Sequence, residues 1–254
     1  MSDTRFSFDG RTAIVTGAGS GIGAEIAREL GRSGAHVIVS DLEQASADPI
    51  AAEIRDVGGT ADALATDVAK AEEVEELVAF AKRKGGGLHM AVNNAGIGGT
   101  AAPVGEYAID NWHQVMDVNL HGVFYGLRYQ IPAMLDSGGG GIVNIASILG
   151  SVGFSTQAAY VASKHAVIGL TKTAAMEYSA KGVRVNSVGP GFINTPILTK
   201  NLDQEAIDGL AALHPAGRIG ETPEVSALVC FLLSERASFI TGSYHLVDGA
   251  YTAQ

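Results

Sequence analysis

The chain has 254 residues, 46% of them hydrophobic and 17% charged, which is typical of a compact folded protein and not of a disordered one. Its formal net charge of -10 argues against binding to nucleic acid, because phosphate recognition needs concentrated Lys and Arg. No stretch approaches the ~18 uninterrupted apolar residues of a transmembrane helix, and the N-terminus lacks the apolar core of a secretion signal. The single cysteine, Cys230, cannot form a disulfide within the chain, so we expect a cytoplasmic protein.

Short runs of apolar or β-branched residues alternate with longer amphipathic segments along the sequence. We predict strands at 12–16, 36–40, 61–66, 88–92, 141–146, 183–188 and 244–247. We predict helices at about 21–33, 48–57, 70–84, 106–136, 157–180 and 222–234. This alternation indicates βαβ units whose parallel sheet is covered by helices on both faces. No repeat and no flexible linker divides the chain, which favours one α/β domain over residues 1–254.

Two segments stand apart from this alternation. The stretch from about 191 to 218 has weak periodicity and several turn residues, and a long irregular stretch inside a compact domain is usually a functional loop. We therefore expect it to form a lid over a substrate. Between Ala158 and Tyr178, the helix predicted at 157–180 has only these charged side chains: Lys164, Lys172 and Glu177. A helix that is apolar on most sides needs cover on most sides, so we expect one face to meet a second subunit.

The first predicted strand runs into a glycine-rich turn, Gly17-Ala-Gly-Ser-Gly21-Ile-Gly23, and then into a helix. Such a turn lets the backbone approach a pyrophosphate and aims the N-terminus of the helix at its negative charge. Gly19, Gly21 and Ala24 fit the dinucleotide-binding fingerprint, while Gly17, Gly21 and Gly23 fit a variant of it. The strand, the glycines and the helix together predict a dinucleotide site.

Asp41 follows the second predicted strand and comes about twenty residues after Gly21, where an acidic side chain would bind the ribose hydroxyls of adenosine. A carboxylate at this place would repel the 2′-phosphate of NADP by a few kcal/mol. No Arg or Lys lies in the glycine turn, and the residue after Asp41 is Leu42. The sequence therefore favours NAD as the cofactor.

Tyr160 and Lys164 are four residues apart on a predicted helix, so the phenol and the ammonium share one face. A free tyrosine has a pKa near ~10, and lowering it to ~7 takes about 4 kcal/mol. One positive charge about 4 Å away supplies on the order of 4 kcal/mol at an effective dielectric of ~20. The spacing therefore predicts a tyrosine whose pKa is lowered by Lys164. Ser147 follows the fifth predicted strand, so its hydroxyl and the phenol can reach one oxygen at the edge of the sheet.

A set of motifs occurs in one order along the chain: Thr16-Gly17-x-x-x-Gly21-x-Gly23, Asn93-Asn-Ala-Gly96, Asn119, Ser147 and Tyr160-x-x-x-Lys164. Together they resemble the short-chain dehydrogenase/reductase family, and the resemblance covers nearly the whole chain. It implies a Rossmann-type doubly wound fold with a seven-stranded parallel sheet flanked by helices, a nicotinamide cofactor and a homotetramer. The chain departs slightly from the family at Val247-Asp-Gly-Ala250, where the family often ends the motif with glycine.

The resemblance also implies roles for individual residues. Tyr160 would donate or accept the proton, and Ser147 would hydrogen-bond the substrate oxygen. Lys164 would lower the tyrosine pKa and hold the nicotinamide ribose, and Asn119 resembles the residue that positions a water in the proton relay. The glycine turn, Asp41 and the resemblance place these residues against the cofactor: Gly17, Ser20, Gly21, Ile22, Gly23, Asp41, Leu42, Asp67, Val68, Asn94, Ala95, Gly96, Tyr160, Lys164, Pro190, Gly191, Ile193 and Thr195.

These features favour an NAD-dependent alcohol dehydrogenase or carbonyl reductase that acts on a small secondary alcohol or its ketone. The segments expected to line its pocket are mostly apolar, which favours an apolar or cyclic substrate. One alternative is reduction of a 3-oxoacyl thioester on a carrier protein, although Asp41 and the acidic composition argue against it. Another is a non-catalytic dinucleotide sensor, which is hard to reconcile with the set of candidate catalytic residues. The histidines show no zinc-type clustering, so we expect no catalytic metal.

Overall fold

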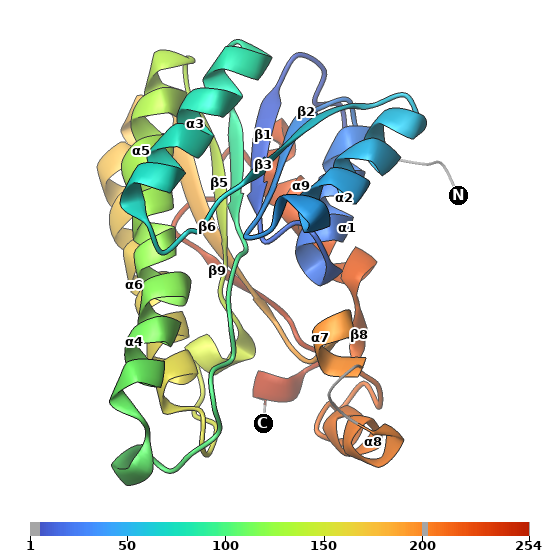
Figure 1. Cartoon of the computed structure of the whole chain (residues 1–254), viewed down its shortest axis with the longest axis vertical. Helices are drawn as coiled ribbons and strands as arrows, with labels where there is room; N and C mark the ends of the chain where they lie inside the picture. Colours follow the sequence, from blue (N-terminus) through green and yellow to red (C-terminus); the bar gives the residue numbers. More distant parts are fainter. Residues whose placement is uncertain (1–5, 200–202, 254) are drawn as a thin grey trace.

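A parallel sheet between two layers of helices forms the centre of the computed structural model, which describes residues 6–199 and 203–253 (Figure 1). The strands of this sheet are β1 Thr12–Thr16, β2 His36–Asp41, β3 Thr60–Ala65, β4 Met90–Asn93, β5 Gly140–Ile145, β6 Val183–Pro190 and β9 Tyr244–Val247. Their order is β3-β2-β1-β4-β5-β6-β9, and all neighbours pair in parallel. The predicted doubly wound fold with a seven-stranded parallel sheet is therefore confirmed.

The position of a binding site follows from the strand order. From β1 the chain winds outward to β2 and β3, and it then returns to place β4 on the other side of β1. The order thus reverses between β1 and β4. Ligands of open α/β sheets bind outside the carboxyl ends of the strands at such a switch point. All five residues of β1 are buried, as a strand covered on both faces requires.

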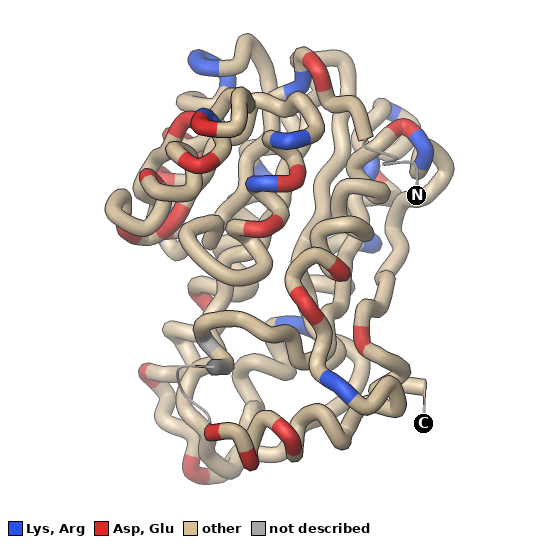
Figure 2. Tube along the Cα trace, turned by 90° about the vertical axis from the view of Figure 1, so that its right-hand side faces the viewer, with Lys and Arg blue, Asp and Glu red and all other residues tan. Residues whose placement is uncertain are grey.

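The helices form one hydrophobic core on each face of the sheet. The helices of one face are α1 Gly21–Arg32, α2 Gln44–Asp56 and α9 Thr222–Leu233, and those of the other are α3 Ala71–Gly85, α5 Gly122–Asp136 and α6 Ala158–Tyr178 (Figure 1). Each core contains buried aliphatic side chains from its helices and from the adjacent strand face. Acidic and basic residues are intermixed along the outer helices (Figure 2). Within the described part of the chain, no helix is long and apolar enough to cross a membrane.

The helix predicted over 106–136 is interrupted in the structure. A 3-10 turn at Val104–Glu106 precedes α4 Ile109–Met116, and a π-helical segment at Asp117–His121 joins α4 to α5. The prediction of one continuous helix is therefore wrong. The wider π-helical turn lies where Asn119 becomes fully buried, and such turns are frequent at functional sites.

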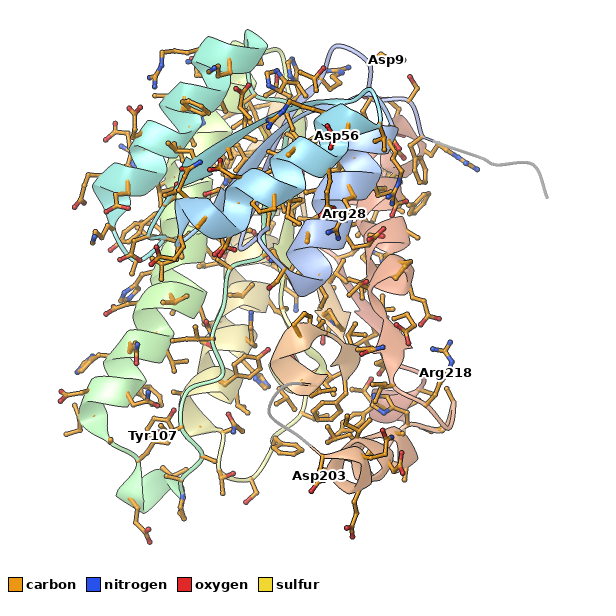
Figure 3. All side chains as sticks on the ribbon, turned by 45° about the vertical axis from the view of Figure 1, so that its right-hand side comes forward. Asp9, Arg28, Asp56, Tyr107, Asp203 and Arg218 are labelled. Carbon is orange, nitrogen blue, oxygen red and sulfur yellow. The ribbon has the colours of Figure 1, made fainter. Side chains whose placement is uncertain are left out.

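The segment predicted to be irregular from about 191 to 218 contains short regular elements. They are β7 Ile193–Asn194, α7 Pro196–Thr199 and α8 Gln204–Ala212, and β7 pairs with β8 Gly220–Glu221. The Asp203 carboxylate caps α8 by accepting a hydrogen bond of 2.9 Å from the Ala206 N–H. Figure 3 shows Asp203 and Arg218 at the end of the molecule that holds α7 and α8, which continue from the carboxyl end of β6.

Candidate active site

The glycine turn between β1 and α1 allows no side chain at two of its positions. Gly17 has a φ of +61°, and a Cβ there would lie 2.8 Å from the Cα of Ala95. A Cβ on Gly23 would overlap the carbonyl oxygen of Gly17. Glycine at these positions therefore lets the turn fold tightly against the segment that follows β4.

The segment after β4 holds this turn in place. The Asn94 side-chain amide donates hydrogen bonds of 2.9 Å and 3.0 Å to the carbonyl oxygens of Thr16 and Gly17. In return, the Thr16 hydroxyl accepts from the backbone N–H groups of Asn94 and Ala95 at 3.1 Å and 3.2 Å. Two sequence motifs that lie far apart in the chain thus form one rigid unit.

The N-terminus of α1 is open toward the carboxyl edge of the sheet. Ser20 is the N-cap residue, and its side chain makes no capping hydrogen bond. The first turn of α1 contains Gly21, Ile22 and Gly23 and no acidic side chain. The free N–H groups and the positive end of the helix dipole therefore fit the pyrophosphate of a dinucleotide.

Asp41 is fixed in orientation at the end of β2. Its carboxylate accepts hydrogen bonds from the Gly19 N–H at 2.8 Å and from the Leu42 N–H at 2.9 Å. Since Leu42 is exposed and Gly19 lies in the glycine turn, the carboxylate sits beside the open N-terminus of α1. Further along the same edge, Asp67 accepts a hydrogen bond of 3.0 Å from the Ala69 N–H, and Val68 is buried. This arrangement suits the adenosine half of a dinucleotide.

Lys164 is buried on α6 and is only 3% exposed. Its Nζ donates a hydrogen bond of 2.9 Å to the carbonyl oxygen of Ile145, at the end of β5. Burial lowers the pKa of Lys164 to about 8, so the amine remains mostly charged at neutral pH. The Nζ lies 5.5 Å from the centre of the Tyr160 ring.

The expected lowering of the Tyr160 pKa is not found. Burial raises the pKa of Tyr160 above its ordinary value, and the nearby Ser147 hydroxyl only partly offsets this effect. The spacing argument placed the ammonium of Lys164 beside the phenol oxygen, whereas the Nζ hydrogen-bonds to Ile145. The prediction is therefore wrong for this structure, in which the phenol is protonated at neutral pH.

Ser147 and Tyr160 nevertheless come together as predicted from their positions. Ser147 follows β5, is 8% exposed, and its hydroxyl accepts a hydrogen bond of 3.2 Å from the Leu149 N–H. The same hydroxyl lies near enough to the phenol of Tyr160 to lower its pKa. Two hydroxyl groups thus face one another at the carboxyl edge of the sheet, where they can bind a single oxygen atom of a substrate.

Asn119 and Gly96 connect this pair to the cofactor segment. The Asn119 side chain accepts from the Ile97 N–H at 2.8 Å and donates to the Ile97 carbonyl at 2.9 Å. A Cβ on Gly96 would lie 3.3 Å from Oδ1 of Asn119 and 3.5 Å from Nζ of Lys164. The segment after β4 therefore touches both the glycine turn and the candidate catalytic lysine.

Sequence reasoning missed Ser163, which is fully buried next to Lys164. Its hydroxyl accepts a hydrogen bond of 3.3 Å from the Asn119 amide and donates one of 2.7 Å to the Tyr160 carbonyl. Ser163 thereby links the π-helical segment to the helix that carries Tyr160. A serine within a helix gives no sequence signal for such a contact, because its partner depends on how α6 packs.

The segment after β6 closes the other side of the site. Pro190 ends β6, and the Gly191 N–H donates a hydrogen bond of 2.9 Å to the Val247 carbonyl on β9. Ile193 is buried in β7, and Thr195 lies so near the glycine turn that a Cβ on Gly21 would be 3.3 Å from its Cγ2. All the predicted cofactor segments therefore meet along one edge of the sheet.

An aromatic cluster forms a wall beside this segment. The ring of Phe192 lies 6.2 Å from Phe154, 5.7 Å from His214 and 6.1 Å from Tyr251, measured between ring centres. Nε2 of His214 accepts a hydrogen bond of 3.3 Å from the Phe192 N–H, which joins the end of α8 to the segment that follows β6. The sequence led us to expect mostly apolar pocket walls, but it gave no signal for His214 and Tyr251.

Comparisons with known proteins agree over nearly the full chain. Residues 17–252 match a family model described as enoyl-(acyl carrier protein) reductase. The chain is 47% identical over 247 residues to cyclohexanol dehydrogenase of Acinetobacter sp. (strain SE19), with 97% of each protein covered. It is 42% identical over 256 residues to 2,5-dichloro-2,5-cyclohexadiene-1,4-diol dehydrogenase of Sphingobium indicum, with 100% of each covered. A crystal structure of a proposed NAD(P)-dependent gluconate 5-dehydrogenase from Beutenbergia cavernae, with bound NADP, superimposes with a TM-score of 0.91 at 40% identity, covering 98% of this chain and 100% of that one.

Proposed function

Because the chain belongs to the short-chain dehydrogenase/reductase family of oxidoreductases, we propose that it interconverts a secondary alcohol on an apolar ring and the corresponding ketone with NAD(H). The observation that carries the proposal is the neighbouring hydroxyls of Ser147 and Tyr160 beside the buried Lys164. The pair lies at the end of β5, the strand next to β4, close to the segments that fit a dinucleotide.

The chemistry divides between the cofactor and the chain. A bound nicotinamide would supply or accept the hydride. The Ser147 hydroxyl would hold the substrate oxygen, and the Tyr160 phenol would exchange a proton with it. In ketone reduction the protonated Tyr160 is already the acid that the oxygen needs. In alcohol oxidation the phenolate is needed, and the charged Lys164 and the Ser147 hydroxyl would stabilise it.

The preference for NAD rests on Asp41. Its carboxylate is held by two backbone N–H groups beside the glycine turn, an arrangement that suits two ribose hydroxyls and repels a 2′-phosphate. The structural neighbour from Beutenbergia cavernae has NADP bound at low occupancy, so the proposed preference of this chain for NAD depends on Asp41 and not on the fold.

The preference for a ring substrate rests on the aromatic wall and on the relatives. Phe154, Phe192 and Tyr251 offer flat apolar surfaces next to the site. The names of two relatives specify a cyclohexanol and a cyclohexadiene diol as their substrates. We further propose that the segment from about 191 to 218 closes over the substrate and that the chain acts as one domain.

A substrate panel tests this proposal. Purified protein would be assayed with cyclohexanol, cyclohexanone, a linear secondary alcohol and a 3-oxoacyl thioester, following the absorbance of the reduced nicotinamide. We expect turnover of the ring compounds with NAD(H) and little turnover of the thioester. Preferred reduction of the thioester with NADPH would contradict the proposal and support the carrier-protein alternative.

A further inference from the structure

Tyr244 connects the edge of the sheet to the candidate catalytic serine. It is the first residue of β9, and its hydroxyl donates a hydrogen bond of 2.6 Å to the carbonyl oxygen of Ser147. The same carbonyl oxygen accepts the Gly150 N–H at 2.8 Å, in the 3-10 turn Ile148–Gly150 that follows β5. The peptide group of Ser147 is thus held by two donors, one of which comes from a strand 97 residues away.

The phenol of Tyr244 is fitted closely into this place. Its ring packs over Gly189 on β6, where a Cβ would lie 2.5 Å from Cε2 and 2.6 Å from Cζ of the ring. Gly189 is buried in the strand next to β9, so glycine at this position makes room for the ring. Burial raises the pKa of Tyr244, which keeps the hydroxyl protonated and able to donate at neutral pH.

The contact matters because Ser147 has few other restraints. Its backbone is extended, with φ of -176° and ψ of 161°, and the turn that follows it is a single turn of 3-10 helix. If the Tyr244 hydroxyl were absent, the carbonyl of Ser147 would retain only the donor within that short turn. The peptide could then rotate, and the Ser147 hydroxyl would move relative to Tyr160.

We propose that Tyr244 is a positioning residue, which holds the Ser147 carbonyl so that the Ser147 hydroxyl stays directed at Tyr160. This inference rests on the proposed function, because it assumes that Ser147 and Tyr160 perform the proton transfer. Misplacement of a reacting group by about 1 Å can lower a rate by about 10²-fold. The Tyr244 hydroxyl bonds to the backbone carbonyl of Ser147 and lies near Ser151 and Tyr160. The proposed effect is the one transmitted through the Ser147 carbonyl.

The variant Tyr244→Phe removes the hydroxyl and keeps the ring over Gly189. We expect kcat to fall by roughly tenfold, while the Kd for NADH and the Tm stay near those of the wild type. The nearby Ser147 hydroxyl lowers the pKa of Tyr160, so displacing it should also move the limb of the alcohol-oxidation pH profile that rises with pH, where the phenolate forms, to higher pH. Tyr125→Phe, on α5, is the matched control and should change none of these values.

A double-mutant cycle supplies an independent measurement. Gly189→Ala should push the Tyr244 ring away and lower kcat, whereas the same change in a Tyr244→Ala background should add little, because the ring is gone. Additive losses, or a wild-type kcat and pH profile for Tyr244→Phe, would overturn the inference. Tyr160→Phe serves as the reference: if it is inactive while Tyr244→Phe is normal, only the positioning role fails. If Tyr160→Phe is active, the proposed function fails.

Discussion

At the scale of single residues, the site combines two hydroxyls with an amine that burial has made easier to deprotonate. The pKa of Tyr160 is raised by burial and that of Lys164 is lowered to about 8 by the same cause. Desolvation disfavours the charged form of both groups, so it moves the two pKa values apart, that of Lys164 downward and that of Tyr160 upward. At neutral pH the phenol is therefore protonated and the amine is still mostly charged, and Tyr160 is the group next to Ser147.

Replacement of Tyr160 by Phe tests the proton transfer directly. The change keeps the ring and removes the hydroxyl, so kcat should fall by roughly 10²–10⁴-fold, the usual contribution of a general acid or base. Binding of NADH, measured by its fluorescence, should persist because the cofactor segments are unchanged. Activity near that of the wild type would refute the role of Tyr160.

The buried amine of Lys164 predicts a pH-dependent stability. The pKa of Lys164 is about 8 in the folded chain and near 10.5 in the unfolded chain. Between these two pH values the unfolded chain therefore binds more protons than the folded chain. Burying the charged amine therefore lowers the free energy of unfolding by its full amount below about pH 8, and by less as the pH rises toward 10.5. In Lys164→Met this cost is absent, so the variant should be inactive but not less stable at neutral pH.

Urea denaturation of both proteins measures this effect. Relative to Lys164→Met, the wild type should gain about 1 kcal/mol in free energy of unfolding between about pH 7 and about pH 9. Other titrating groups are common to both proteins and cancel in the difference. If the difference in free energy of unfolding between the two proteins stays constant with pH, or changes in the opposite direction, then Lys164 is not desolvated in the folded protein.

At the scale of elements, the turn from β1 to α1 and the end of β2 form one cofactor-binding unit. The Asp41 carboxylate accepts a hydrogen bond from the Gly19 N–H and thereby connects the end of β2 to the glycine turn. We predict a kcat/KM for NADH well above that for NADPH. The Asp41→Ala variant should decrease the ratio of these two values by about tenfold or more, because repulsion between the carboxylate and a 2′-phosphate costs a few kcal/mol at this range. Asp48→Ala on α2 is an exposed acidic control that should leave the ratio unchanged. A native preference for NADPH would contradict the assignment.

The helices and strands were predicted best from the sequence where burial determines the pattern of apolar residues. Strands covered on both faces are apolar runs bounded by turns, and the predicted strands overlap all seven strands of the sheet. The helix start predicted at about 48 was wrong, because α2 begins at Gln44 and includes Pro49. The interruption of 106–136 by a π-helical segment was also missed, since α- and π-helical turns share one residue pattern.

The sequence could not predict contacts that depend on packing between distant segments. The approach of Tyr244 to Ser147 spans 97 residues and requires both the sheet order and the space above Gly189. The raised pKa of Tyr160 was missed for a related reason, because residue spacing gives the distance between two side chains but not their burial. The motifs therefore indicated which residues gather at the site, and packing determined their electrostatics.

At the scale of the whole molecule, the outer face of α5 and α6 predicts self-association, and the family resemblance implies that the assembly is a homotetramer. Phe124 on α5 is 46% exposed and Met176 on α6 is 88% exposed, and α6 carries few charges along its length. Large apolar side chains exposed on neighbouring helices are typical of protein interfaces. Sedimentation at micromolar concentration should give one species of four times the 26.1 kDa chain mass.

A charge placed on that face should weaken the assembly. Burying an unpaired carboxylate costs several kcal/mol, so the double variant Phe124→Glu and Met176→Glu should sediment as smaller species while its circular dichroism stays native. Val57→Glu adds a charge at an exposed apolar residue at the end of α2, on the opposite helical layer, and should leave the sedimentation unchanged. A wild-type protein that is a stable monomer would contradict the assembly. A tetramer that persists in the double variant would instead place the interface on another face.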